Sequence, residues 1–319
     1  MIYLKNYLTF LVIITLTLYS CKKDVEIIEE KDEGLKTENV IIIIIDGPRY
    51  AETWGDNSHE NIPYLAKTIK LKGIVNTNFF NNGFTYTLPG HLALSTGRYY
   101  PIDNFGGELP PFPSIYQYYK QTYPDKNCWI ISSKDKIELL SNTSESDYNN
   151  KYLANTDCGI NGLGSGYRED SITTYNTINI LTNEHPSLVL INLKDPDTWG
   201  HANNWEKYIE SIKKSDEYIN EIVSLIDTNP YYKDKTTLFI TNDHGRHEDA
   251  YGGFQNHGDN CEGCRHIMFF GYGPDFKKNS TIDTRYELVD IANTTAKLLN
   301  FNLPNSNGIV MEELFEKNN

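Results

Sequence analysis

Positive charge is scarce in this sequence. Its 319 residues include 29 Lys and Arg against 43 Asp and Glu, which gives a formal net charge of −14 at pH 7. A protein that binds nucleic acid through its surface needs a basic patch that releases the counterions of the phosphates. No basic stripe is present, so we exclude a nucleic-acid-binding surface. An anionic substrate would then need local cations, for which metal ions are the obvious candidates.

Repeats and low-complexity tracts are also absent. The chain is long enough, with 39% hydrophobic residues, to build one large domain. A second CxxC motif is missing as well: Cys261 and Cys264 form the single one. A four-cysteine zinc site is therefore excluded, and the pair is left as a disulfide, a redox pair or half of a zinc knuckle. We favour a structural disulfide, because Cys128, Cys158, Cys261 and Cys264 make an even number.

The N-terminus holds an apolar run, Tyr7–Tyr19, that follows Lys5 and falls short of the roughly 20 residues needed to span a bilayer. The run ends in Leu18-Tyr19-Ser20-Cys21, which resembles a bacterial lipobox. We predict a lipoprotein signal peptide over residues 1–20, cleavage before Cys21 and lipidation of Cys21. The alternative is an uncleaved anchor helix.

This N-terminus predicts a lipid anchor to the membrane and a location in the bacterial cell envelope, on the periplasmic or cell-surface side. Residues 21–38 are charged and poor in apolar side chains, which predicts a flexible tether. Residues 39–319 then predict a single catalytic domain.

Continuous β-branched and apolar runs alternate with helical patterns along the rest of the chain. The runs at 40–45, 188–193 and 238–241 predict strands that are buried on both faces. The apolar stripe from Trp205 to Ile226 predicts an amphipathic helix between two of them. We therefore predict an α/β fold with a largely parallel central β-sheet that helices cover on both faces.

Acidic residues follow three of these strands. Asp46, Asp197 and Asp243 come at or just after their carboxyl ends, where open α/β sheets place their sites. Three carboxylates at one sheet edge repel one another unless cations lie between them. His201 and His244 stand close to these acids in the sequence. Mixed carboxylate and imidazole ligation favours zinc over calcium or magnesium.

A threonine opens a further predicted helix. Thr87 stands two residues before Pro89, and the apolar run behind it ends at Gly97. The unpaired N–H groups of a helix N-terminus bind phosphoryl oxygens, so Thr87 is either a cap or a nucleophile beside bound phosphate.

Five motifs in this order resemble the alkaline phosphatase superfamily, and within it the type I phosphodiesterase/nucleotide pyrophosphatase branch. They are Asp46-Gly47-Pro48-Arg49, Thr87-Leu88-Pro89-Gly90-His91, Asp197-Thr198-Trp199-Gly200-His201, Asn242-Asp243-His244-Gly245 and Asn256-His257-Gly258.

The resemblance implies two divalent metal ions, most simply zinc, and Thr87 as a nucleophile that becomes covalently phosphorylated. One ion would be held by Asp197, His201 and His257, and the other by Asp46, Asp243, His244 and the hydroxyl of Thr87. His266 is the alternative to His257. Asn104 is the nearest substitute for an asparagine that holds a phosphate oxygen in that branch.

The implied function is hydrolysis of phosphodiester or pyrophosphate bonds in a small-molecule phosphate ester. A phosphomonoesterase or a phospho-group transferase with the same nucleophile is one alternative, and an inactive, metal-stabilised binding protein is another.

Overall fold

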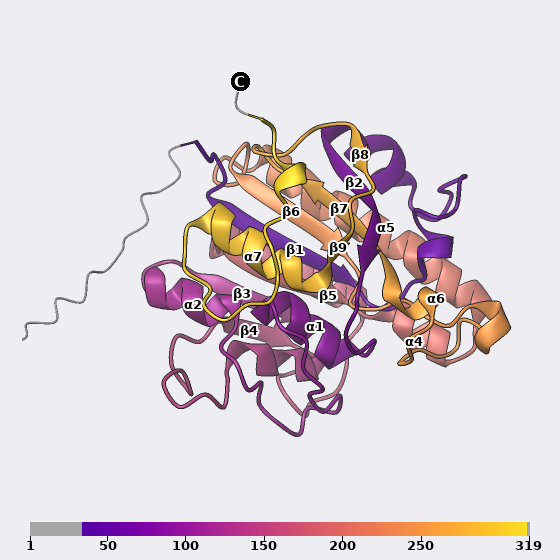
Figure 1. Cartoon of the computed structure of the whole chain (residues 1–319), viewed down its shortest axis with the longest axis horizontal. Helices are drawn as coiled ribbons and strands as arrows, with labels where there is room; N and C mark the ends of the chain where they lie inside the picture. The colour runs from indigo at the N-terminus through magenta and orange to yellow at the C-terminus, as the bar shows by residue number, and fades with distance from the viewer. Residues whose placement is uncertain (1–33, 318–319) are drawn as a thin grey trace, which may run out of the picture. The chain divides into compact units, whose positions relative to one another are not determined.

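The computed structural model describes residues 34–317 (Figure 1). The predicted signal peptide, Cys21 and most of the predicted tether lie outside these residues. Lys36 and Thr37 fall at the end of that tether, and their backbone N–H groups donate to the Asp275 carboxylate at 2.8 and 2.9 Å. The ordered domain therefore begins before residue 39. Within residues 34–317, no helix combines the length and the apolarity that a bilayer span requires.

The core is one sheet with the strand order β4-β3-β5-β1-β6-β7-β2-β8, and β9 pairs with β2. The strands are β1 (Asn39–Ile45), β2 (Gly73–Phe80), β3 (Cys128–Ser132), β4 (Asn155–Cys158), β5 (Leu188–Leu193), β6 (Thr236–Thr241), β7 (His266–Tyr272), β8 (Ser280–Ile282) and β9 (Tyr286–Glu287).

β1 lies at the centre of the parallel part of the sheet. It pairs in parallel with β5 on one side and β6 on the other, with Ile43 opposite both Ile191 and Ile240. All seven of its residues are buried, as its unbroken β-branched sequence predicts. Only β7 runs against this direction, antiparallel to both β6 and β2, so the prediction of a largely parallel sheet is confirmed.

The helices are α1 (Thr87–Thr96), α2 (Ile115–Thr122), α3 (Asp170–Asn183), α4 (Asp195–His201), α5 (Trp205–Thr228), α6 (Glu262–Arg265) and α7 (Leu288–Leu299). Single turns of helix lie at Tyr50–Glu52, Leu65–Ile69, Lys70–Lys72, Asp249–Tyr251 and Glu312–Leu314, and a longer 3₁₀ segment lies at Asp135–Ser141.

Alternate residues of β1 pack into two separate hydrophobic cores. Ile42 and Ile44 join the core formed with α1, α2 and α7. Ile41 and Ile43 join the core formed with α3 and α5. Since neighbouring strand residues face opposite sides of a sheet, helices cover both faces as predicted (Figure 1).

Two features differ from the expectation. α3 was not predicted, because its sequence is rich in Thr, Asn and Ile and has no clear apolar stripe. The segment 141–166 is polar and has glycine at 159, 162, 164 and 166, a composition typical of an irregular loop, yet it contains the edge strand β4.

Asp216 lies on the buried stripe of α5. Its carboxylate accepts hydrogen bonds from the backbone N–H groups of Tyr64 and Leu65, at 2.7 and 2.9 Å. These N–H groups begin the helical turn at Leu65–Ile69 and have no partner within it. Asp216 therefore ties this turn to α5.

Candidate metal centre

The carboxyl ends of three adjacent strands meet at one edge of the sheet. β5, β1 and β6 are neighbours in that order, and Asp197, Asp46 and Asp243 follow them. Asp46 directly follows β1, and Asp243 follows β6 with one residue, Asn242, between them. Asp197 lies in the first turn of the short helix α4. All three side chains are buried. The sheet topology thus brings together the acids that the sequence places far apart.

Asp46, Asp243 and His244 form a first group of ligand atoms within 4.8 Å of one another. Asp46 Oδ1, Asp243 Oδ2 and His244 Nε2 are buried and have no hydrogen-bond partner. His244 Nε2 lies 3.6 Å from Asp46 Oδ1 and 3.4 Å from Asp243 Oδ2. Buried polar atoms without partners are costly, so three that face one another fit a divalent metal ion that accepts carboxylate and imidazole donors.

The electrostatics of this first group agree with metal ligation. Burial lowers the pKa of His244 to about 3, so its imidazole is neutral and its lone pair is free. Burial, followed by repulsion from Asp243, raises the pKa of Asp46. A carboxylate under such repulsion is stabilised by a cation beside it.

Asp197, His201 and His257 form a second group, again within 4.8 Å. The Nε2 atoms of the two histidines are 3.0 Å apart, and each lies 3.3 Å from Asp197 Oδ1. Burial opposes ionisation of Asp197, but Lys134 and both histidines hold its pKa well below the usual range. Two imidazoles and an ionised carboxylate are a suitable donor set for zinc.

Backbone carbonyls orient two of these imidazoles. His257 Nδ1 lies 2.7 Å from the Thr85 carbonyl oxygen, and His244 Nδ1 lies 2.9 Å from that of Gly245. A carbonyl accepts only from a protonated nitrogen, so the lone pair of each ring is on Nε2, the atom that faces its group. Such bonds fix the tautomer of histidine ligands.

Thr87 is the first residue of α1, and its side chain is buried. The helix packs closely against the metal centre, because a Cβ on Gly90 would lie only 2.7 Å from the Asp243 carbonyl oxygen. Glycine at this position therefore lets the N-terminal turn of α1, which carries Thr87, reach the ligand groups.

Lys134 is the main site residue that the sequence reasoning missed. Its Nζ lies 2.9 Å from Thr87 Oγ1, 2.9 Å from Asp46 Oδ2 and 2.7 Å from Asp197 Oδ2. Burial acts to lower the pKa of Lys134, but Asp197 and Asp46 outweigh it and raise the pKa, so the side chain is an ammonium. Lys134 comes after β3, the neighbour of β5. The rule that sites lie at the carboxyl ends of parallel strands, which identified the three aspartates, would therefore also have identified Lys134.

Arg246 was missed as well. Its side chain is fully buried and its Nη1 donates to Asp197 Oδ1 at 2.6 Å. The rest of its guanidinium donates to the carbonyl oxygens of Phe254 and Gln255. Arg246 therefore orients Asp197 and anchors the loop that leads to His257.

Asn104 lies at the N-terminus of α1, as the prediction of a phosphate contact requires. Its Oδ1 accepts from the backbone N–H of Leu88 at 2.9 Å and from Lys136 Nζ at 3.1 Å. The bond to Leu88 holds the Asn104 side-chain amide at the turn of α1 that contains Thr87.

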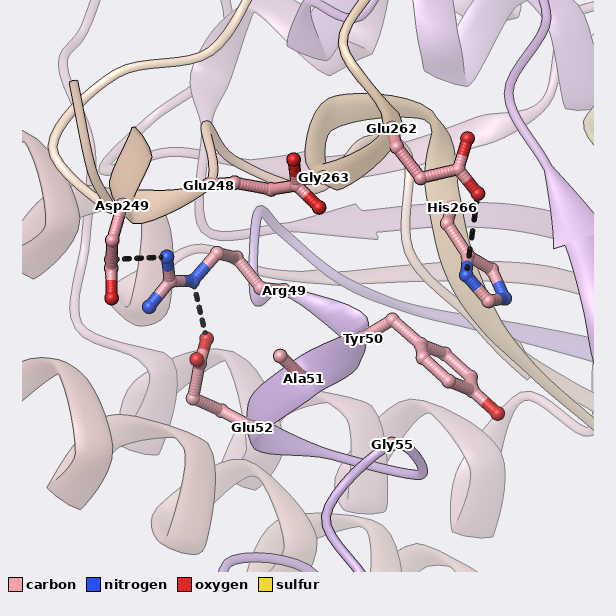
Figure 2. Close-up of a pocket in the computed structure, with 10 residues that line it drawn as sticks. All are labelled: Arg49, Tyr50, Ala51, Glu52, Gly55, Glu248, Asp249, Glu262, Gly263 and His266. Atoms are coloured by element: carbon pink, nitrogen blue, oxygen red, sulfur yellow. Dashed lines mark hydrogen bonds and ion pairs between the residues drawn. The ribbon is translucent and has the colours of Figure 1, made fainter. Parts of the chain in front are cut away.

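His266 is not brought to either ligand group. Its Nε2 lies 2.9 Å from the Thr77 carbonyl oxygen, and its ring stacks on Tyr50 and Phe80. Figure 2 shows His266 beside Glu262. Both residues line a pocket of about 490 Å³ that contains no residue of either ligand group. Of the two alternatives, the structure brings His257 to Asp197 and His201.

Residues 131–303 match the Metalloenzyme superfamily. This chain belongs to that superfamily. Together with the structural likenesses below, the match confirms the alkaline phosphatase superfamily that the motifs indicated. The family implies divalent metal ions, in agreement with the two ligand groups.

A sequence relative is the phosphopentomutase of Clostridium botulinum (strain Alaska E43 / Type E3), 28% identical over 142 residues, which are 44% of this chain and 32% of that protein. The chain thus spans about a third of the length of this curated relative.

Two solved structures share the fold. Murine ectonucleotide pyrophosphatase / phosphodiesterase 5 is 14% identical, with a TM-score of 0.65 over 87% of this chain and 100% of that chain. The phosphonate monoester hydrolase of Agrobacterium radiobacter is 12% identical, with a TM-score of 0.64 over 87% of this chain and 77% of that chain.

Replacing His244 tests the first ligand group. We expect His244→Ala to bind one divalent ion fewer per chain than the wild type, because the imidazole supplies one of the three donors of this group. Elemental analysis after dialysis against zinc measures this. His185→Ala, which removes an exposed histidine, should keep the wild-type metal content. Unchanged metal content in His244→Ala would exclude this group as a metal site.

Proposed function

We propose that the protein is an exported, metal-dependent phosphohydrolase that cleaves phosphodiester or pyrophosphate bonds through a phospho-threonine at Thr87. One observation carries the proposal: the Thr87 hydroxyl and a carboxylate from each ligand group converge on the same ammonium, Lys134 Nζ. The contacts of the Thr87 hydroxyl point to no structural role that an ordinary helix-capping side chain could not fill.

Bound divalent ions, most simply zinc, would supply the positive charge that makes a hydroxyl or a water ionise near neutral pH. Asp46, Asp243 and His244 would hold one ion with Thr87, and Asp197, His201 and His257 would hold the other.

The residues around Thr87 prepare it to attack phosphorus. Lys134 donates to its oxygen and so favours loss of the hydroxyl proton to solvent. The Thr87 oxygen then forms a bond to phosphorus as the bond to the leaving oxygen breaks. Water later cleaves the phospho-threonine, which returns Thr87 and releases the phosphate product. The Asn104 Nδ2 group and the backbone N–H of Thr87, the first residue of α1, would bind the phosphoryl oxygens.

The known proteins of this fold support the choice of reaction. Murine ectonucleotide pyrophosphatase / phosphodiesterase 5 carries the proposed activities in its name, and one of its structures is an inactive threonine-to-alanine variant in complex with AMP.

Replacing Thr87 tests the nucleophile. We expect Thr87→Ala to lower kcat/KM for bis-p-nitrophenyl phosphate by roughly a thousand-fold or more, because no other hydroxyl replaces the nucleophile. Thr96→Ala, which changes a buried threonine at the opposite end of α1, should retain most of the activity. Equal activity of Thr87→Ala and wild type would overturn the covalent mechanism.

A phosphomonoesterase or phospho-group transferase is the second candidate, and Lys136 favours it. Its side chain is buried, and its Nζ donates to Asn104 O at 2.7 Å and to Asn104 Oδ1. Burial, and then repulsion from Lys134, lowers the pKa of Lys136 to about 8. A second cation beside the phosphate position complements a dianionic monoester better than a monoanionic diester. The sequence relative named above is a mutase.

Charge at Lys136 provides the test. Because its pKa in the folded protein is lowered to about 8, Lys136 is charged below that pH and loses its proton above it. If the monoester is the substrate, kcat/KM for p-nitrophenyl phosphate should fall above pH 8 in the wild type and less so in Lys136→Arg. Lys136→Met should lower monoester hydrolysis at pH 7 by at least about tenfold more than diester hydrolysis. Parallel losses on both substrates would favour the diesterase.

The proposed location rests on the N-terminal sequence. Leu18-Tyr19-Ser20-Cys21 resembles a lipobox, and we expect radiolabelled palmitate to be incorporated by the wild type and not by Cys21→Ser in a bacterial host. Labelling of both proteins, or of neither, would contradict lipidation at Cys21.

A further inference from the structure

The loop between β6 and β7 contains a second kind of donor cluster. His247, Asp259, Cys261 and Cys264 each offer one ligand atom, and these four atoms lie within 4.8 Å of one another. None of the four belongs to the two ligand groups described above. The cluster combines two sulfur atoms, one imidazole nitrogen and one carboxylate oxygen, which is a donor set that zinc accepts.

The two cysteines are not joined. Among the described residues, Cys128, Cys158, Cys261 and Cys264 are all free thiols, so the disulfide we expected at the CxxC motif is not formed. The sequence reasoning had also left half of a zinc knuckle as an option. A complete knuckle was expected to need a second CxxC motif. In the fold, His247 and Asp259 lie beside Cys261 and Cys264 and offer the other two ligand atoms.

The spacing of the donors fits a tetrahedral ion. With zinc bonds of about 2.0–2.3 Å, the ligand atoms of such a site lie about 3–4 Å apart. His247 Nε2 is 3.1 Å from Asp259 Oδ2, yet it is buried and makes no hydrogen bond. Cys264 is fully buried, whereas the Asp259 side chain is 50% exposed. The cluster therefore has a closed inner side and an open side through which an ion can enter.

Backbone contacts hold the four residues in place. Cys261 N donates to Asp259 Oδ1 at 2.9 Å, and Gly245 N donates to Cys264 O at 2.8 Å. Gly263, between the cysteines, packs so closely that a Cβ there would lie 2.5 Å from the Arg246 carbonyl oxygen. The CxxC turn is thus pressed against the segment that follows His244.

We propose that His247, Asp259, Cys261 and Cys264 form a structural zinc site separate from the two-ion centre. Zinc binding displaces one proton from each thiol, so two thiolates, one carboxylate and one neutral imidazole surround the ion. No electron transfer is involved, and the sulfur atoms stay reduced.

The site would position His257. The Asp259 carbonyl oxygen accepts from Thr85 Oγ1 at 2.8 Å, and the Thr85 carbonyl oxygen in turn accepts from His257 Nδ1 at 2.7 Å. An ion that fixes Asp259 therefore fixes, through Thr85, the ring that faces Asp197. Cys261 and Cys264 act through these contacts and are positioning residues.

Cobalt substitution tests the proposal on the full-length protein. Thiolate ligation of Co²⁺ gives a charge-transfer absorption in the near ultraviolet, and neither ligand group of the two-ion centre contains a thiolate. We expect this absorption in the wild type and in Thr87→Ala, and its loss in Cys261→Ser/Cys264→Ser. Zinc content should fall by one ion per chain in that double variant and stay unchanged in Cys158→Ala, which removes a buried cysteine elsewhere.

Asp259→Asn keeps both thiols and serves if the double variant does not fold. We expect it to retain the absorption and to bind zinc at this site at least about tenfold more weakly, as measured by competition with a chelator. A wild-type protein that binds cobalt without the thiolate absorption would overturn the proposal. So would a Cys261–Cys264 disulfide found by peptide mapping of protein purified without reductant. Both results are independent of whether Thr87 is the nucleophile.

Discussion

The repulsion among three buried carboxylates is the constraint on which this structure depends. Asp46, Asp197 and Asp243 are carried to one edge of the sheet by strands that cannot separate, because β1 is hydrogen-bonded to both β5 and β6. Their negative charge is stable in the folded protein only if cations lie among them. Lys134 supplies one such cation, and the unpaired atoms around His244 mark where a metal ion would supply more. Cations at this edge of the sheet are therefore needed both for the stability of the fold and for the proposed chemistry.

The sequence predicts the parts of this arrangement that local patterns encode. Unbroken β-branched runs identify the buried parallel strands, and the rule that sites lie at their carboxyl ends brings the three acids together. Lys134 also follows a parallel strand, β3, so the same rule applies to it. A lysine or arginine in a loop is usually exposed, however, and the burial of Lys134 and Arg246 is visible only once β3 and the loop after β6 are in place. α3 was missed because Thr and Asn dilute its apolar face.

The segment from His244 to His266 joins both halves of the proposed chemistry. It begins with His244 of the first ligand group and passes through His257 of the second. It also carries His247, between those two histidines, and Asp259, Cys261 and Cys264, which follow His257. Arg246 binds Asp197 and the carbonyl oxygens of its own loop. A segment with so little regular secondary structure is held by its polar contacts, so its conformation is tied to the ions and charges it surrounds.

The spread of the site along the chain bears on how the protein folds. Asp46 and His257 are more than 200 residues apart in the sequence, and the strands around the site lie side by side in the order β5-β1-β6-β7-β2, which is not their order along the chain. Contacts between residues this distant form late and slowly. The two ligand groups are therefore complete only when all the strands of the sheet have paired. The rate at which activity recovers after denaturation would then report on the last step of folding and not on the first.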